Sequence, residues 1–281
     1  MYYFEYPQID TTIYEGSVTS SINTGLDQIL EINKNMNQAG TTIDVSRVLI
    51  KFDYSYISSS VQSGVIPSTA KYYLNLYDAS SEELAVEQTL FAYMVSGSWT
   101  GGTGTKDRDP ALSDGASWKY RDNDTTKTAW VGSNTTQGGT WFTSSVSQYN
   151  VSASTGTTAV ASPTKNVSAS TDLVYETKDI RMDVTDLVKN HLYSGSVYPN
   201  NGFILKRENL PTSQSMFSIF DPTTSTGSAE HDTSHQGNLK FFSRETNTIF
   251  PPKLEVEWDD SVWNTGSLSP LSSTDLDRLK I

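Results

Sequence analysis

The sequence predicts an all-β fold, an antiparallel β-sandwich, and three observations support that prediction. Apolar and polar residues alternate along Arg47–Asp53 and along Ala70–Tyr77, which is the pattern of a strand with one buried face. Similar short segments recur, and clusters of Gly, Asn, Ser and Asp separate them as turns do. Aromatic residues make up 11 % of the chain, and aromatic side chains favour strands.

The predicted strands lie in two groups along the chain. The first group consists of Thr11–Tyr14, Gln28–Ile32, Arg47–Asp53, Ala70–Tyr77 and Glu87–Tyr93. The second group consists of Phe203–Arg207, Met216–Phe220, Leu239–Ser243 and Leu254–Trp258. Within Arg47–Asp53 the alternation places Val48, Ile50 and Phe52 on one face of the strand and Leu49 on the other face.

Helical periodicity is confined to short stretches. Val184–Tyr193 is the best of them, because its apolar positions fall on one side of a helix: Leu187, Val188, His191 and Leu192. Ser55–Gln62 is the next best match to a helical period. We therefore expect a sandwich with one short helix, at Val184–Tyr193.

The composition shifts to Ser, Thr, Gly and Asn between Trp99 and Tyr175. Within this stretch Asn150–Thr155 reappears identically at Asn166–Thr171, either as two strands of one hairpin or as drifted low-complexity sequence. The Trp residues in its first half indicate that this half is packed. We expect one domain over residues 1–258, with a long Ser/Thr/Gly-rich insertion at about 99–175.

After the last predicted strand, Asp259–Ile281 has the composition of a C-terminal tail. A helix-start signal at Ser273–Asp275 leads into apolar residues that have no local core. Such a segment frays or docks, and we expect docking on its own domain or on a neighbouring chain. The candidate docking residues are Leu271, Leu276, Leu279 and Ile281.

Charge and composition exclude several classes of protein. The formal net charge of -12 argues against nucleic-acid binding, which needs clustered Lys and Arg. No run approaches the roughly 20 apolar residues of a membrane span, and the first residues do not read as a secretory signal. The chain contains no cysteine, which excludes disulfides, thiolate metal sites and thiol nucleophiles.

No catalytic constellation is present, so we expect no enzyme and assign no catalytic or cofactor-binding residue. His231 and His235, with Glu230 and Asp232, are the one metal-like cluster, but their surroundings predict a solvated loop. The glycine-rich Gly101–Gly104 opens no helix and predicts no phosphate site. The acid-rich loops offer oxygen ligands for a structural calcium ion, at Asp107–Asp109 and Asp122–Asp124.

Several segments, taken in order, resemble the DNRLRE-type β-sandwich family, a jelly-roll relative of carbohydrate-binding modules. The resemblance covers about Thr11 to Trp258 and implies a jelly-roll-like antiparallel sandwich. It implies that Trp118, Trp130 and Trp141 pack loops onto the sandwich. The segments that carry it are Ser46–Asp53, Ile66–Ala70, Tyr72–Tyr77, Trp99, Asp114–Arg121, Trp130, Gly138–Trp141, Met182–Val188, Gly202–Lys206, Phe242–Glu245 and Pro251–Val256.

Two further features follow from these segments. Asp183–Thr185 is expected to form a strand-to-helix corner capped by a side-chain oxygen. Arg244 and Glu245 are expected to form a partly exposed salt bridge that braces a turn, and such a pair contributes under about 1 kcal/mol.

The opening segments Asp10–Gly16 and Asn23–Ile32 are similar to those of virion structural proteins of marine tailed phages, especially phages of cyanobacteria. This resemblance implies a non-enzymatic virion component, in capsid decoration, neck or tail. Its expected partners are other virion proteins and further copies of itself as a homo-oligomer, and its expected location is the virion.

The alternative is a carbohydrate-binding module that recognises an extracellular or host-surface polysaccharide. In that case exposed indole rings would stack on sugar faces, and Trp99 and Trp130 are the candidate stacking residues. The competing interpretation places the same rings in the packing of loops. A third possibility, a bacterial adhesin repeat, would require export and neighbouring copies.

Overall fold

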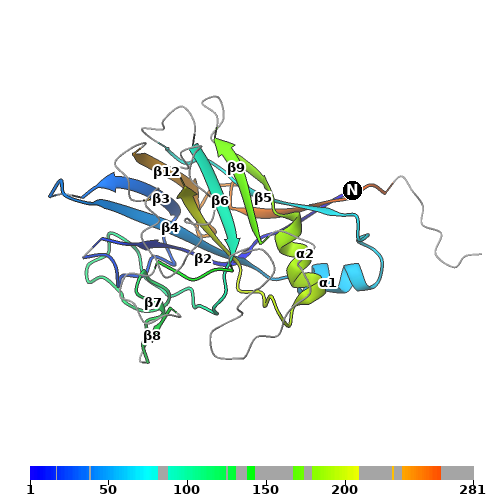
Figure 1. Cartoon of the computed structure of the whole chain (residues 1–281), viewed down its shortest axis with the longest axis horizontal. Coiled ribbons are helices and arrows are strands. Elements are labelled where there is room, and N and C mark those ends of the chain that lie inside the picture. The colour runs from blue at the N-terminus through cyan, green and yellow to red at the C-terminus, as the bar shows by residue number, and fades with distance from the viewer. Residues whose placement is uncertain are drawn as a thin grey trace, which may run out of the picture.

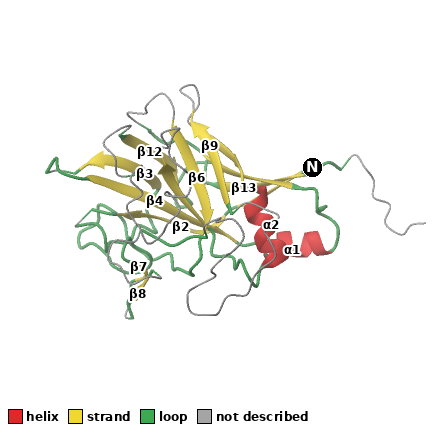
Figure 2. Cartoon of the chain, viewed as in Figure 1, coloured by secondary structure: helices red, strands yellow, loops and turns green. Residues whose placement is uncertain are grey.

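The computed structural model describes residues 1–16, 18–37, 39–81, 88–124, 126–130, 138–142, 167–173, 179–208, 230 and 236–260. Within these residues antiparallel strands form two main sheets, and two short helices lie together at one end of the molecule (Figures 1 and 2). The predicted all-β, sandwich-like fold is confirmed. The expectation of a single helix was wrong, because Ser55–Gln62 is a helix as well.

The smaller sheet has four strands, in the order β1 (Tyr2–Glu5), β13 (Lys253–Glu257), β5 (Lys71–Leu76) and β10 (Ile180–Asp183). All neighbouring strands in it are antiparallel. The first strand of the chain therefore lies beside the last one, with Tyr3 opposite Val256. This pairing joins the two ends of the described chain across one sheet.

The larger sheet has seven strands. Its path runs β12 (Gly237–Phe242), β3 (Ile29–Met36), β4 (Ile43–Phe52), β11 (Phe203–Glu208), β6 (Gln88–Met94) and β9 (Ser168–Leu173). Off this path, β2 (Pro7–Tyr14) pairs with β4. A separate two-stranded sheet is formed by β7 (Tyr120–Asp122) and β8 (Thr128–Ala129) in the segment after β6.

The main hydrophobic core lies between the two sheets. From β4 the side chains of Val48, Ile50 and Phe52 enter it, as their alternation predicts. From the smaller sheet Leu74 and Val256 meet them. All five side chains are fully buried, so the predicted inward face of these strands is confirmed.

A second hydrophobic core covers the opposite face of the larger sheet. Leu49 points into it, as expected, together with Tyr93 of β6. The segment after β6 lies over this face and contributes Trp99, Trp118 and Trp130. The larger sheet is therefore buried on both sides, and the prediction that the Trp-bearing half of the insertion is packed is confirmed.

The two helices begin in the same way. At α1 (Ser55–Gln62) the Asp53 Oδ1 accepts the backbone N–H of Ser55 at 2.9 Å. At α2 (Thr185–Ser194) the Asp183 Oδ1 accepts the backbone N–H of Thr185, also at 2.9 Å. An otherwise unpaired N–H of the first turn is thus satisfied in each helix, and the predicted corner at Asp183–Thr185 is confirmed.

Some predicted segments lie outside the described residues. These are Met216–Phe220, the first copy of the repeat at 150–155, and most of the tail, including Leu271, Leu276, Leu279 and Ile281. The second copy of the repeat supplies β9. In the part of the chain that the structure describes, no helix is long and apolar enough to cross a membrane.

Candidate interaction surface

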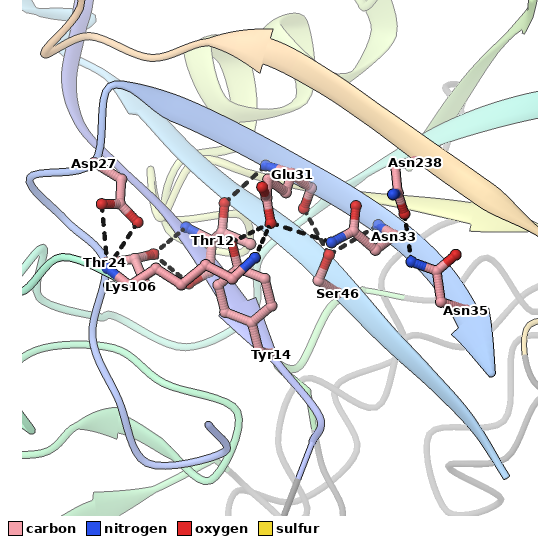
Figure 3. Close-up of polar contacts among 10 residues, drawn as sticks. All are labelled: Thr12, Tyr14, Thr24, Asp27, Glu31, Asn33, Asn35, Ser46, Lys106 and Asn238. Atoms are coloured by element: carbon pink, nitrogen blue, oxygen red, sulfur yellow. Dashed lines mark hydrogen bonds and ion pairs between the residues drawn. The ribbon is translucent and has the colours of Figure 1, made fainter. Parts of the chain in front are cut away.

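A row of polar side chains lies where β3 separates from β4 (Figure 3). We call it the polar seam, and its members are Thr12, Tyr14, Thr24, Asp27, Glu31, Asn33, Ser46 and Lys106. Ser46 occupies the point of separation: its Oγ donates to Glu31 O at 2.7 Å and accepts Asn33 N–H at 2.8 Å. Thr12 Oγ1 accepts Glu31 N–H at 3.0 Å. Side chains therefore satisfy main-chain groups that the diverging strands leave without a ladder partner.

Glu31 stands at the centre of the polar seam and accepts three side-chain hydrogen bonds. The donors are the hydroxyl of Tyr14 at 2.8 Å, Nδ2 of Asn33 at 3.1 Å and Nζ of Lys106 at 2.5 Å. The Lys106 ammonium also lies 4.6 Å from the centroid of the Tyr14 ring. Lys106 belongs to the segment after β6, so this group joins that segment to the sheet.

A hydrogen-bonded Tyr, Glu and Lys also have the chemical types of an acid–base site. Burial, followed by the nearby Glu31 charge, raises the pKa of Tyr14 well above its ordinary value of 10.0. Burial opposes ionisation of Glu31, but the hydrogen bonds from Lys106, Tyr14 and Asn33 outweigh it and lower the Glu31 pKa. Both pKa values are thus shifted away from neutral pH, whereas an efficient general acid or base has a pKa near the operating pH. The polar seam is a structural anchor.

A second anchor of the same segment lies at Asp27. Its two carboxylate oxygens accept the backbone N–H of Lys106 at 3.2 and 3.1 Å. Burial raises the pKa of Asp27 to about 6, with help from the charges of Asp107 and Glu31. Lys106 is thus held by both its main chain and its side chain.

Asn23 fixes the glycine-rich segment that follows Trp99. Its Nδ2 donates to Gly101 O at 2.6 Å and to Ala116 O at 2.9 Å, and its Oδ1 accepts the N–H groups of Gly25 and Gly104 at 2.9 and 3.0 Å. This role was not predicted. The feature of the sequence that could have indicated it is the Gly101–Gly104 run. A Cβ atom at Gly102 would lie 2.3 Å from Asn23 Oδ1, so a residue without a side chain is needed for this close approach.

The expectation of a solvated loop is wrong at Glu230, which is 3 % exposed. It is buried and accepts two hydrogen bonds from Arg47, at 3.1 Å from Nε and 2.6 Å from Nη2, and Lys206 Nζ lies 2.9 Å from the same carboxylate. Burial opposes its ionisation, but the charges of Arg47 and Lys206 lower its pKa well below the ordinary value. His231, His235 and Asp232 lie outside the described residues.

The ion cluster is covered by aromatic rings of the second core. The guanidinium of Arg47 lies 4.6 Å from the ring centroid of Trp118 and 5.2 Å from that of Trp141, and Arg47 Nη1 donates to Gly138 O at 2.6 Å. Cation–π contacts of this kind stabilise a desolvated cation. The cluster therefore holds the segment after β6 on the sheet, and it is closed to solvent.

The predicted stacking residues Trp99 and Trp130 are 6 % and 1 % exposed. Trp99 Nε1 donates to Asn201 O at 2.7 Å and Trp130 Nε1 to Ser117 O at 2.9 Å. Neither ring presents an open face to solvent as it lies here, because both fill the second core. The two rings therefore lie where the packing interpretation places them, and we do not propose them as sugar-stacking residues.

In one of the two acid-rich loops predicted to offer calcium ligands, a carboxylate oxygen is bound within the protein. Asp122 Oδ1 accepts hydrogen bonds from Thr100 Oγ1 at 3.3 Å and from the backbone of Asp124 at 3.2 Å. Among the described residues no three acidic or histidine side chains are grouped closely enough to hold a metal ion.

The outward side of the four-stranded sheet, which we call the outer face, is the surface that these cores leave open. A charged group crosses it: Arg181 Nη2 lies 2.9 Å from Glu255 and 2.8 Å from Glu257. The guanidinium of Arg181 stacks 3.5 Å from the ring centroid of Tyr73. Tyr2 donates to Glu257 at 3.3 Å. These side chains alternate with the core residues of the same strands, so the whole row points outward.

A row of aromatic rings continues the outer face toward the turn before β13. Lys253 Nζ lies 4.4 Å from the ring centroid of Phe4 and 5.4 Å from that of Tyr77. The Tyr77 ring lies 5.4 Å from Phe250, which is 44 % exposed, and Ile249 beside it is 87 % exposed. The outer face therefore presents apolar rings next to ordered charges, the mixture found at protein interfaces.

The turn after β12 is braced as expected. Arg244 Nε lies 3.4 Å from Glu245 Oε1, and both side chains are partly exposed, which confirms the predicted salt bridge. The backbone N–H of Arg244 also donates to the buried Asp10 Oδ2 at 2.7 Å, and its guanidinium donates to Gln8 O. This turn is thus fixed to β2.

The sequence matches no protein-family model and no curated protein. The proposals below therefore stand on the residues and surfaces of this chain.

Proposed function

We propose that the chain is a non-enzymatic virion structural protein of a tailed bacteriophage, a capsid-decorating, neck or tail component. It acts through contacts with other virion proteins and with copies of itself. The similarity of Asp10–Gly16 and Asn23–Ile32 to phage structural proteins supports the setting. The surface chemistry supports the mode of action.

The observation that carries this proposal is the outer face. The sheet carries the ordered pair of Arg181 and Glu255, and the turn before β13 presents Ile249 and Phe250 to solvent, with Phe250 against the Tyr77 ring. Exposed apolar groups bordered by fixed charges favour a protein partner, because the charges are already oriented and lose little freedom on binding.

The polar clusters support the non-enzymatic part of the proposal. At the polar seam, the pKa values of Tyr14 and Glu31 are shifted away from neutral pH, which is unfavourable for general acid–base catalysis. At Glu230 the carboxylate is buried and paired with Arg47 and Lys206. Both clusters bind one part of the chain to another.

The test is complementation of a phage that lacks the gene, using plasmid copies of the chain. The wild-type copy should enter the particles, and the Ile249→Ser/Phe250→Ser variant should enter them at a reduced level. Val65→Ser is the matched control, because Val65 is also apolar and 61 % exposed but lies after α1, away from the outer face. A wild-type copy that never enters particles would overturn the proposal, and equal entry of both variants would overturn the role of the outer face.

A second candidate is binding of a host-surface polysaccharide by the same face. Phe4 is 41 % exposed and Tyr2 is 59 % exposed, and Glu257 and Lys253 beside them supply hydrogen-bonding groups. Rings flanked by such groups suit sugar faces. A glycan array with wild type and Phe4→Ala separates the candidates: binding that Phe4→Ala abolishes favours the polysaccharide, and no binding to any glycan contradicts it.

A further inference from the structure

The outer edge of β1 is open. On its inner edge β1 pairs with β13. The residues that flank this pairing form a hydrogen-bonded pair, because Met1 N–H donates to Trp258 O at 2.5 Å and Trp258 N–H donates to Met1 O at 3.1 Å. Because bonded and non-bonded pairs alternate in antiparallel sheets, Tyr2 and Phe4 direct their N–H and C=O groups away from β13. No residue in the part of the chain that the structure describes hydrogen-bonds to these outward groups.

The same strand exposes a row of aromatic side chains. Tyr2 and Phe4 are 59 % and 41 % exposed, and their spacing places them on one side of the strand, while Tyr6 just after it is 55 % exposed. An edge strand with free main-chain groups and large apolar side chains is a template for pairing with another strand. Figure 2 shows the N-terminus, next to which β1 begins, at the margin of the described part of the molecule.

We propose that β1 pairs with β1 of a second copy of this chain, antiparallel and centred on Phe4, to form a homodimer with one continuous sheet. A two-fold axis at Phe4 places Phe4 opposite Phe4 of the second copy and Tyr2 opposite Tyr6 of the second copy. Tyr2 and Phe4 direct their main-chain groups outward, so the register makes a hydrogen-bonded ladder centred on Phe4. The aromatic rings then form cross-strand pairs on the outer side.

The strand is self-complementary on its other side as well. The register places Tyr3 opposite Glu5 of the second copy, and within one chain the hydroxyl of Tyr3 already donates to Glu5 at 2.5 Å. No carboxylate therefore faces a carboxylate across the axis. This matters because each copy carries a net charge of -12, and copies repel one another wherever their acidic surfaces meet. Only one charged side chain lies between Tyr2 and Tyr6.

A second copy is the occupant that this register favours over an unrelated strand. An unrelated strand would satisfy the main-chain groups equally well, but nothing in β1 selects its side chains. Isologous pairing, by contrast, brings the same β1 surface of both copies together, so the assembly is complete as a dimer. The inference does not rest on the proposed function, since it concerns the purified chain in solution.

The first test is the mass of the purified full chain in solution, by sedimentation equilibrium or light scattering. Wild type should be a dimer at high micromolar concentration and dissociate on dilution. Phe4→Pro removes the outward N–H and the aromatic ring of Phe4, at a position where an edge strand tolerates proline, and should be monomeric with an unchanged circular dichroism spectrum. A wild type that is monomeric at every concentration overturns the proposal, and so does a folded Phe4→Pro variant that still dimerises.

A second variant keeps the test decisive if Phe4→Pro does not fold. The chain has no cysteine, so Phe4→Cys carries one thiol per copy. A hydrogen-bonded antiparallel pair places the two Cα atoms about 5.5 Å apart, which is within reach of a disulfide. Mild oxidation should give a covalent dimer of Phe4→Cys much faster than of Val65→Cys, whose position is exposed after α1. Equal rates for the two variants contradict the pairing.

Discussion

Lys106 Nζ lies 2.5 Å from Glu31 Oε2, although 75 residues separate the two along the chain. The pair joins the segment after β6 to the strand β3, and Tyr14 and Asp27 complete the anchor (Figure 3). The second core beneath that segment depends on such anchors, because the segment itself has few regular backbone hydrogen bonds beyond β7 and β8. The predictions below test the anchors one at a time.

Replacement of Lys106 by Met should lower the free energy of unfolding by about 1 kcal/mol, since the pair is only partly buried and part of its attraction is screened by solvent. The exposed fractions of the two side chains, 35 % and 14 %, set this modest expectation. Urea unfolding followed by Trp fluorescence measures it. The control is Lys127→Met, an exposed cation 5.6 Å from the Tyr120 ring, which should change stability by less than about 0.5 kcal/mol. Equal effects of the two variants would show that the Glu31 contact contributes nothing.

Replacement of Asn23 by Ala should cost about 3 kcal/mol, because the buried carbonyls of Gly101 and Ala116 lose their donor and two N–H groups lose their acceptor. Limited proteolysis should also cut the Gly101–Gly104 region sooner than in wild type. Asn37→Ala is the matched control: Asn37 makes comparable bonds to Thr41 and Thr42, but in an exposed turn. If both variants unfold at the same denaturant concentration, the role assigned to Asn23 is wrong.

Replacement of Arg47 by Met should cost about 3–5 kcal/mol, because it leaves the buried Glu230 carboxylate with fewer compensating groups. Glu230→Gln should cost at least as much, because it leaves two buried cations, Arg47 and Lys206, without a carboxylate partner. Chemical denaturation of both variants, with near-ultraviolet circular dichroism to report the Trp118 environment, measures the difference. Stabilities of both variants close to that of wild type would contradict the pairing.

Asp10 should make the protein less stable as the pH rises toward neutrality. Burial raises its pKa from 3.8 to about 7, although the backbone N–H of Arg244 donates to it. The folded state holds this proton more tightly than the unfolded chain does, so the contribution to the free energy of unfolding is complete below about pH 4 and lost toward pH 7. It amounts to a few kcal/mol at most, on the order of 1.4 kcal/mol for each pKa unit.

The measurement is the free energy of unfolding of wild type and Asp10→Asn between pH 4 and pH 7.5. The variant should have a shallower slope, because the amide keeps an acceptor for Arg244 but does not titrate. Asp27→Asn is the control, since the pKa of Asp27 rises only to about 6 and its share of the slope ends earlier. Parallel curves for wild type and Asp10→Asn would mean that the Asp10 proton is not linked to folding.

The sequence predicts the interior of the strands well and the ends of the chain poorly. Along Arg47–Asp53 the alternation is strict, because each face of β4 packs against its own core, and Leu49 therefore stood apart from Val48 and Ile50. In β1, by contrast, Tyr2, Tyr3 and Phe4 are all aromatic, so no alternation marks which face is buried. Its partner β13 lies at the other end of the described chain, and nothing local indicates that pairing.

The anchors were missed for a related reason. Glu230 stands among Ser, Ala and His residues that predict a solvated loop, and its burial depends on Arg47, far away along the chain. Such charge pairs leave no periodic trace in a sequence. The aromatic pattern was more informative, since Trp118 and Trp130 predicted a packed insertion and the second core contains both.

The most direct test of the proposed function is mass spectrometry of gradient-purified particles from the phage that encodes this chain. The account predicts peptides of the chain at a fixed ratio to the major capsid protein, retained after a high-salt wash because contacts through the outer face are largely apolar. Absence of the chain from intact particles, while it is abundant in the infected-cell lysate, would contradict the account.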